Sequence, residues 1–303
     1  MNEAGPFMNK KALYLGLFTV VAWGSSFAAI RVSLLGGYSP GHLVLTRFIV
    51  ASLVFILYAM WPGTKIRIPE RQDIWKILLL GWTGISVYHF GLTYGEQTVA
   101  AGTAGLFIAT VPIFTAIIAV IFLKERISPL GWIGMAIGLA GVALITIGSS
   151  DGAVEISAGA WFILAAVIAT SLFFVFQKPL FTRYKPIELT AYFTWAGTLP
   201  FLFFTPGLLN EIQGATLEAT LSTIYMGLIP ATIAYVTWST ALSMADAGAV
   251  SSLLYVEPVV AILVAYVWLQ ELPSALSAIG GLIAILSVIA VNWEAMRRRT
   301  VLK

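Results

Sequence analysis

The sequence predicts an all-α, polytopic membrane protein with ten transmembrane helices, arranged as two inverted five-helix repeats. Two observations lead to this fold class. Hydrophobic residues make up 59% of the 303 residues and charged residues only 10%, whereas a soluble chain of this length carries far more charge. The stretch Gly102 to Val142 is also echoed without a gap by Gly248 to Val288, so that Pro112, Glu125 and Gly134 fall on Pro258, Glu271 and Gly280. The chain is therefore one membrane unit, duplicated.

Ten apolar stretches are separated by charged or Gly/Pro-rich breaks, and each is near the ~20 residues that a helix needs to cross a bilayer. The first is longer than the apolar part of a signal peptide and contains Arg31, so we expect it to be retained. The predicted spans are 12–35, 41–61, 74–94, 102–123 and 130–148, then 158–180, 187–209, 219–242, 249–270 and 276–293. Residues 1–148 and 158–293 would form the two repeats, and 294–303 a basic tail.

The basic residues predict the orientation of the spans. With a cytoplasmic N-terminus, all 17 Lys and Arg residues except Arg31 and Arg47 fall on the cytoplasmic side, as the positive-inside rule requires. We therefore expect an inner-membrane protein with both termini in the cytoplasm. An odd number of spans in each half places the second half upside down. Consistent with this, Lys124 and Arg126 are replaced by Gln270 and Leu272 in the second copy.

Inverted repeats are characteristic of secondary transporters, which bind their substrates near the bilayer midplane between the two halves. Polar residues that line such a cavity should recur in both copies. One face of the third span carries Thr83, Ser86, Phe90, Thr93, Tyr94 and Gln97 with His89 at its edge, and one face of the eighth carries Tyr225, Thr232, Tyr235, Ser239 and Ser243. The alternative is that these hydroxyl groups bond their own backbone or a neighbouring helix. Their recurrence favours a cavity wall.

Ionisable residues within the spans are the next candidates. Glu257 is the deepest acid, about 12 Å from the inner end of its span, and is a candidate proton or substrate-amine site. Alternatively, it is a protonated carboxyl that bonds backbone freed by Pro258. Arg47, about 9 Å from the outer end, is expected to bond carbonyl groups or Glu96 rather than Glu257. His89 could bind or gate, or serve only in packing.

Pro112 and Pro258 are expected to bend the fourth and ninth spans at symmetric places, which makes them candidate gating points, although static packing kinks would look the same in sequence. Most tryptophans lie near span ends, as an interfacial belt requires. Trp23 and Trp238 lie deeper and are better candidates for a cavity wall.

Signatures of enzymes are missing from the sequence. There is no Walker loop, GxGxxG, GxSxG or HExxH motif, and two histidines, His42 and His89, cannot build a multi-histidine metal site. The absence of cysteine excludes disulfides and thiolate chemistry. We therefore expect no enzymatic activity, no cofactor and no bound metal. The expected partners are the lipid bilayer and a small-molecule substrate, with a proton if Glu257 titrates; nucleic acid is not implied, and monomer and homodimer both remain open.

The sequence resembles the drug/metabolite transporter superfamily in its ten-helix form with two EamA repeats. The resemblance rests on Trp23-Gly24-Ser25-Ser26-Phe27, on Arg47-Phe48, and on the repeated proline, glutamate and glycine. The second copy departs from this pattern, with Thr170-Ser171-Leu172 opposite Gly24-Ser25-Ser26 and Phe193 opposite Arg47. The resemblance implies a cavity lined by spans 1, 3, 4, 6, 8 and 9, with spans 5 and 10 packed behind it. It is strongest to YddG-type exporters of amino acids, including aromatic ones.

The expected function is thus export of small metabolites, above all amino acids, by alternating access without ATP. The alternatives are a drug/proton antiporter and an exporter of other metabolites such as purines or sugars. The residues expected to bind the substrate are Trp23, Ser26, Ser86, His89, Thr93, Tyr94, Thr232, Tyr235, Trp238 and Ser239, with Glu257 as a charge or proton site.

Overall fold

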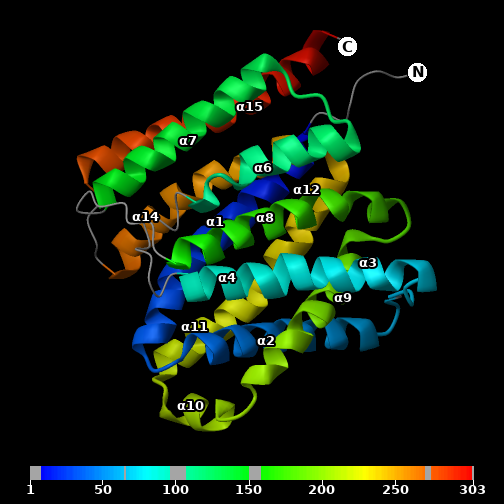
Figure 1. The fold of residues 1–303 in the computed structure, drawn as a ribbon, viewed down its shortest axis with the longest axis vertical. Coiled ribbons are helices and arrows are strands. Elements are labelled where there is room, and N and C mark those ends of the chain that lie inside the picture. The colour runs from blue at the N-terminus through cyan, green and yellow to red at the C-terminus, as the bar shows by residue number, and fades with distance from the viewer. Residues whose placement is uncertain (1–7, 65, 96–106, 150–157, 270–273, 302–303) are drawn as a thin grey trace.

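The computed structural model describes residues 8–64, 66–95, 107–149, 158–269 and 274–301, and all regular secondary structure in these ranges is helical (Figure 1). The first half contains α1 (Lys10–Leu35), α2 (Pro40–Met60), α3 (Arg71–Gly81), α4 (Tyr88–Gly95), α6 (Val111–Ile118) and α7 (Pro129–Ser149). The second half contains α8 (Ala158–Phe176), α9 (Pro186–Thr198), α10 (Leu208–Gly214), α11 (Leu217–Leu228), α12 (Ala234–Met244), α13 (Ala247–Ser251), α14 (Glu257–Leu269) and α15 (Ala275–Val301).

Several of these helices join end to end into longer stretches, which match the predicted spans. A π-helical segment, Trp82–Val87, connects α3 to α4, and another, Ile229–Ile233, connects α11 to α12 at the equivalent place in the second repeat. Within the described residues, five stretches are long and apolar enough to cross a membrane: Lys10–Leu35, Pro40–Met60, Gly159–Thr182, Leu217–Met244 and Ala247–Trp268. Shorter apolar helices cover Val111–Leu123, Pro129–Ile145 and Ala278–Val291.

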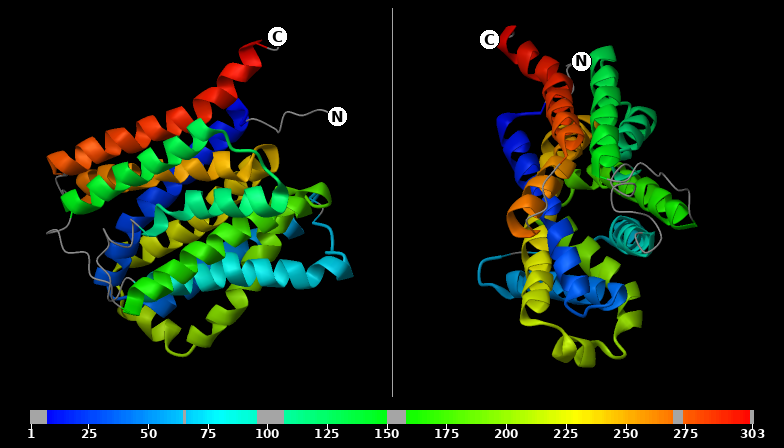
Figure 2. Two further views of the ribbon diagram at one scale, coloured as in Figure 1. Left: turned by 45° about the horizontal axis from the view of Figure 1, so that its top comes forward. Right: turned by 90° about the vertical axis from the view of Figure 1, so that its left-hand side faces the viewer.

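The two repeats are inverted relative to each other. The equivalent helices α7 and α15 lie side by side and run in opposite directions, as both figures of the whole chain show (Figures 1 and 2). Their contacts mirror each other as well, because α1 packs on α11, α12 and α14 while α8 packs on α4 and α6. The start of α1 and the end of α15 lie at one end of the bundle, which we call the terminal end, and the other is the opposite end.

Close glycine contacts hold α7 against α15. A Cβ atom added to Gly141 would lie 2.8 Å from the carbonyl oxygen of Gly280, and one added to Gly280 would lie 2.5 Å from that of Gly141. Small residues let two membrane helices approach to backbone contact. The pair forms one edge of the molecule (Figure 1), away from the cavity described below.

The prolines begin helices in this structure. Pro112 lies in the first turn of α6, and Pro258 follows the first residue of α14, directly after a 3₁₀ segment, Ser252–Val256. Proline is tolerated there because the first N–H groups of a helix have no partner within it. The predicted bends are therefore breaks between helical segments.

The predicted span 187–209 also differs from a single helix. The α-helix α9 ends at Thr198, a 3₁₀ segment that includes Pro200 follows as Leu199–Phe204, and the unpredicted short helix α10 comes next. Six positions named in the sequence analysis lie outside the described residues: Glu96, Gln97, Gly102, Gln270, Glu271 and Leu272.

Candidate functional site

A cavity of about 170 Å³ lies between the two repeats. The first repeat contributes Trp23, Ser26, Phe27, Ile30, Leu34, Pro40, Leu43, Val44, Arg47, Tyr88, His89, Leu92, Thr93, Ile108 and Val111, and the second contributes Thr170, Phe174, Tyr235, Leu254 and Glu257. The wall therefore comes from α1, α2, α4, α8, α12, α14 and the start of α6. Helix α2 was not among the spans expected to line it.

Aromatic rings close the cavity on the side of the terminal end. The Trp23 ring lies 5.2 Å from Tyr235, 5.1 Å from Trp238 and 6.4 Å from Phe174, between ring centroids. Trp23 is fixed in place because its Nε1–H donates a hydrogen bond of 3.0 Å to the carbonyl of Pro230, in the π-helical segment of the second repeat. An apolar substrate group can stack on such a surface.

Polar groups are few on this wall and most of them have a partner. The Ser26 hydroxyl donates to the carbonyl of Trp23 at 2.6 Å. His89 Nε2 and the Tyr235 hydroxyl lie 3.2 Å apart, and the His89 ring packs on Phe48 with 4.8 Å between centroids. The fold thus brings four polar sequence candidates together in one cavity: Ser26, His89, Thr93 and Tyr235.

Arg47 faces the same cavity as Glu257, a residue with which the sequence analysis did not pair it. Its exposed fraction is 4% and that of Glu257 is 7%, and both line the wall. Neither side chain forms a hydrogen bond or ion pair with another described residue, and Arg47 Nε is buried without a partner there. Depth along straight helices placed the two far apart. The cavity extends over both depths, and this is a property of the packing that helix position alone does not reveal.

Five sequence candidates do not line the cavity. Ser86 donates its hydroxyl to the carbonyl of Gly197 at 2.8 Å, and Thr232 donates to that of Gly227 at 2.7 Å. These are the backbone bonds that the alternative interpretation of the hydroxyl stripes required. Tyr94 stacks on Phe90.

The remaining two, Trp238 and Ser239, lie behind the aromatic wall towards the terminal end. Trp238 is fully buried against Trp23 and Phe174. Ser239 donates to Gln177 Oε1 at 3.1 Å and accepts a hydrogen bond from Thr190 at 3.2 Å. These hydroxyl and amide groups form a buried polar layer between the cavity and the terminal end.

Sequence reasoning missed several lining residues, including Phe27, Tyr88, Thr170 and Phe174. The repeat gave a signal for Thr170, which is the equivalent of Gly24, next to Trp23 on the first helix, but none for Phe174, whose equivalent is Ala28. Tyr88 had no sequence signal, because it lies outside the polar face of the third span, beyond His89 at the edge of that face.

A partly buried ion pair joins the two repeats on the terminal side of the polar layer around Ser239. Lys178 Nζ lies 2.7 Å from Glu125 Oε1 and donates to the carbonyl of Ala245 at 2.6 Å. Glu125 also accepts the backbone N–H groups of Ala247 at 3.0 Å and Gly248 at 3.4 Å. We call this set of contacts the Glu125 clasp.

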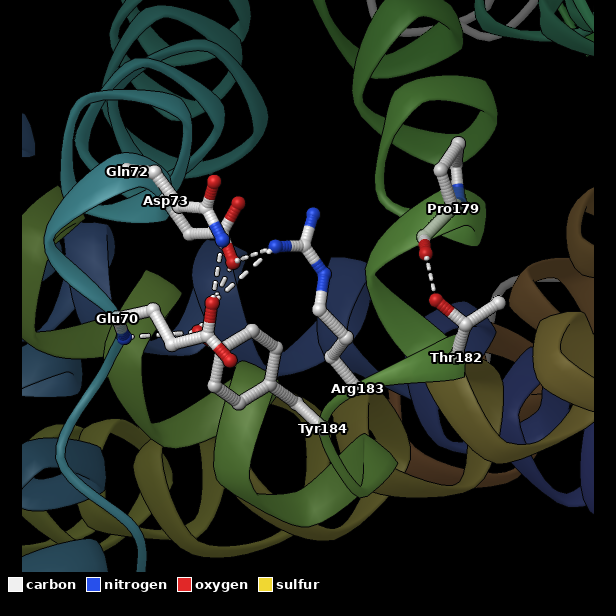
Figure 3. A network of polar contacts seen from close by, with 7 residues as sticks. All are labelled: Glu70, Gln72, Asp73, Pro179, Thr182, Arg183 and Tyr184. Carbon is white, nitrogen blue, oxygen red and sulfur yellow. Dashed lines mark hydrogen bonds and ion pairs between the residues drawn. The ribbon is translucent and has the colours of Figure 1, made fainter.

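A second polar cluster ties α3 to the segment between α8 and α9 (Figure 3). Asp73 lies 2.8 Å from an Arg183 nitrogen and accepts the Tyr184 hydroxyl at 3.0 Å. The Tyr184 oxygen in turn accepts the backbone N–H of Glu70 at 2.9 Å. The clasp and this cluster connect the first repeat to the second on the terminal side of the cavity.

The cavity extends away from these contacts. Its wall continues from Trp23 along α1 to Leu34, in the last turn of that helix, and to Pro40 at the start of α2. The α1–α2 connection lies at the opposite end of the bundle (Figure 1). The structure is thus closed towards the terminal end and hollow towards the opposite end.

Comparison with known proteins identifies relatives over the whole chain. The model of the EamA-like transporter family matches residues 10–147 and again 157–293. The uncharacterized transporter YdfC of Bacillus subtilis is 38% identical over 92% of this chain and 88% of its own. A probable terminal-alkyne amino-acid exporter of Streptantibioticus cattleyicolor is 37% identical over 95% of this chain and 96% of its own. A protein of known crystal structure shares the fold, with a TM-score of 0.78 and 22% identity over 94% of this chain and 98% of its own.

Proposed function

Because the chain belongs to the EamA-like transporter family, with two copies of the EamA repeat, we propose that it exports amino acids, including apolar and aromatic ones. Transport runs by alternating access without ATP, the two repeats rocking about the cavity between them. The protein lies in the inner membrane with its terminal end in the cytoplasm, as the distribution of Lys and Arg favours.

The observation that carries this proposal is the composition of the cavity wall. Trp23, Phe27, Phe174 and Tyr235 supply aromatic surface, and Arg47 and Glu257 supply opposite charges within the same enclosed volume. At about 170 Å³, the cavity has room for roughly ten water-sized groups, which is the scale of one amino acid. The relative named as a probable terminal-alkyne amino-acid exporter supports the same substrate class.

The direct test is flux into or out of liposomes that contain the purified protein. A panel of radiolabelled amino acids should include members that cross faster than in empty liposomes, with apolar and aromatic members fastest because of the aromatic wall. A panel in which every member crosses at the rate of empty liposomes would remove the amino-acid function. A variant with both Trp23 and Phe174 changed to alanine tests the role of the aromatic wall, because it should lose the preference for amino acids with large side chains.

A drug/proton antiporter is the second candidate, favoured by the buried acid Glu257 in the cavity wall. In that case, Glu257→Gln should abolish efflux driven by a pH gradient and spare exchange down a solute gradient. Equal pH-driven efflux in Glu257→Gln and wild type would exclude coupling through this residue.

A further inference from the structure

Two buried ionisable side chains in the cavity wall, one from each repeat, form no hydrogen bond or ion pair with any described residue. Arg47 lies on α2 and Glu257 begins α14. Their charged atoms do not approach within 4.0 Å of each other, and no other described residue forms an ion pair with either. The Arg47 guanidinium carbon lies 5.6 Å from the Phe48 ring centroid. Tyr235 lines the same cavity as both residues.

A buried guanidinium without a partner is unfavourable in the empty protein because arginine keeps its charge, whereas an unpaired carboxyl takes up a proton until a cation binds beside it. A buried charge needs a partner to offset its lost hydration, and intramembrane charges without partners mark ligand or ion sites by default. A single ligand offsets both charges only if it carries an anion and a cation. A carboxylate suits Arg47, because the planar guanidinium can donate two parallel hydrogen bonds to it. An ammonium group suits the carboxylate of Glu257.

We infer that Arg47 and Glu257 form a two-point site for the backbone of a zwitterionic α-amino acid, Arg47 binding the α-carboxylate and Glu257 the α-ammonium. The inference rests on the proposed function and narrows it to free amino acids. The aromatic surface of Trp23 and Phe174 then receives the substrate side chain. Amines without a carboxylate, acids without an ammonium, and blocked amino acids are excluded as good substrates. The site also joins the repeats, since each contributes one charge.

The test uses wild-type protein in liposomes and the amino acid of highest flux, for example phenylalanine. Unlabelled phenylalanine, phenethylamine, which lacks the carboxylate, and 3-phenylpropionate, which lacks the ammonium group, compete with the labelled amino acid. Each missing charged hydrogen-bonding group should weaken competition about 10- to 100-fold. Equal competition by all three compounds would overturn the inference, although flux of phenylalanine itself would still support the proposed function. Flux no higher than in empty liposomes for every amino acid would instead refute the proposed function.

Variants assign each charge to its group. Arg47→Gln should remove the advantage of phenylalanine over phenethylamine and retain its advantage over 3-phenylpropionate, and Glu257→Gln should show the reverse pattern. Arg126→Gln and Glu218→Gln, at exposed positions outside the cavity wall, are matched controls and should keep wild-type selectivity. Thermal unfolding in detergent checks that each variant is folded. The inference is contradicted if a folded Arg47→Gln or Glu257→Gln protein keeps wild-type selectivity, or if competition by all three compounds weakens equally in it. If either variant fails to fold, the wild-type competition series decides alone.

Discussion

Removal of the charge of Glu125 should open the terminal end of the protein. The carboxylate accepts Lys178 Nζ at 2.7 Å and two backbone N–H groups of the second repeat. Glu125→Gln keeps the size of the side chain and one oxygen acceptor but loses the ion pair. A hydrogen bond to a charged group is worth about 1.5–3 kcal/mol. If the clasp exists only in the state closed at the terminal end, the open population rises about 10- to 100-fold.

The natural absence of cysteine makes this population measurable. Ser239→Cys places a single thiol in the buried polar layer between the clasp and the cavity, where a maleimide reaches it only from an open terminal end. We expect Glu125→Gln to raise the labelling rate of Ser239→Cys about 10- to 100-fold over the same thiol in the otherwise unchanged protein. Arg126→Gln removes an exposed neighbouring charge and should leave the rate unchanged.

A second change distinguishes the ion pair from local damage. Removing one partner of this partly buried pair leaves an uncompensated charge, whereas removing both partners is less costly. Lys178→Gln combined with Glu125→Gln should therefore label more slowly than Glu125→Gln alone. The reasoning is refuted if Glu125→Gln labels at the wild-type rate, or if the double change labels faster than either single one.

Three further predictions concern stability, measured as unfolding in detergent. Burial and the nearby Glu125 carboxylate raise the pKa of Asp246, between α12 and α13, from 3.8 to about 6, against the opposing effect of Lys178. The ionised form of Asp246 is thus disfavoured in the folded protein, and the free energy of unfolding falls as pH rises from about 4 to 6. Asp246→Asn should therefore raise the free energy of unfolding by about 1–2 kcal/mol at pH 7 and leave it unchanged below pH 4. An equal gain at both pH values would contradict this cause. Arg183→Gln leaves the buried Asp73 with Tyr184 alone and should lower the free energy of unfolding by about 1–3 kcal/mol. Arg71→Gln, at an exposed position, should change it little, and equal effects of the two substitutions would argue against a stabilising role of the Asp73 cluster. Gly141→Ala would place a Cβ 2.7 Å from the Ala284 backbone nitrogen and should cost about 1–3 kcal/mol, whereas Gly214→Ala, with no atom within 4 Å of its Cβ, should be close to neutral.

The membrane fold could be predicted from sequence because its causes are local. Apolar length determines which stretches cross the bilayer, and the repeat of Pro112 and Glu125 in Pro258 and Glu271 exposed the duplication. The π-helical segment at Trp82–Val87 had no such signal, whereas the one at Ile229–Ile233 contains Pro230, which disturbs helical hydrogen bonding. They depend on how the third and eighth spans pack, and this is not visible in hydrophobic periodicity.

The site was predicted less completely because a polar residue on a helix face can either line a cavity or form a hydrogen bond with a nearby backbone carbonyl. Ser26, His89 and Tyr235 reach the cavity, whereas Ser86 and Thr232 turn to nearby carbonyl groups with the same sequence signature. Only the packed neighbours decide between these outcomes. Arg47 and Glu257 lie at different depths along their spans, yet both line the cavity, because it runs between helices from different repeats.

The most direct test of the account asks whether an amino acid occupies this cavity. Ser26→Cys provides one thiol on the cavity wall in a chain without other cysteines, and Ser243→Cys provides an exposed control thiol outside it. The account predicts that saturating amounts of a transported amino acid slow maleimide labelling of Ser26→Cys and leave Ser243→Cys unchanged. Labelling of Ser26→Cys that proceeds at one rate with and without the amino acid would contradict it.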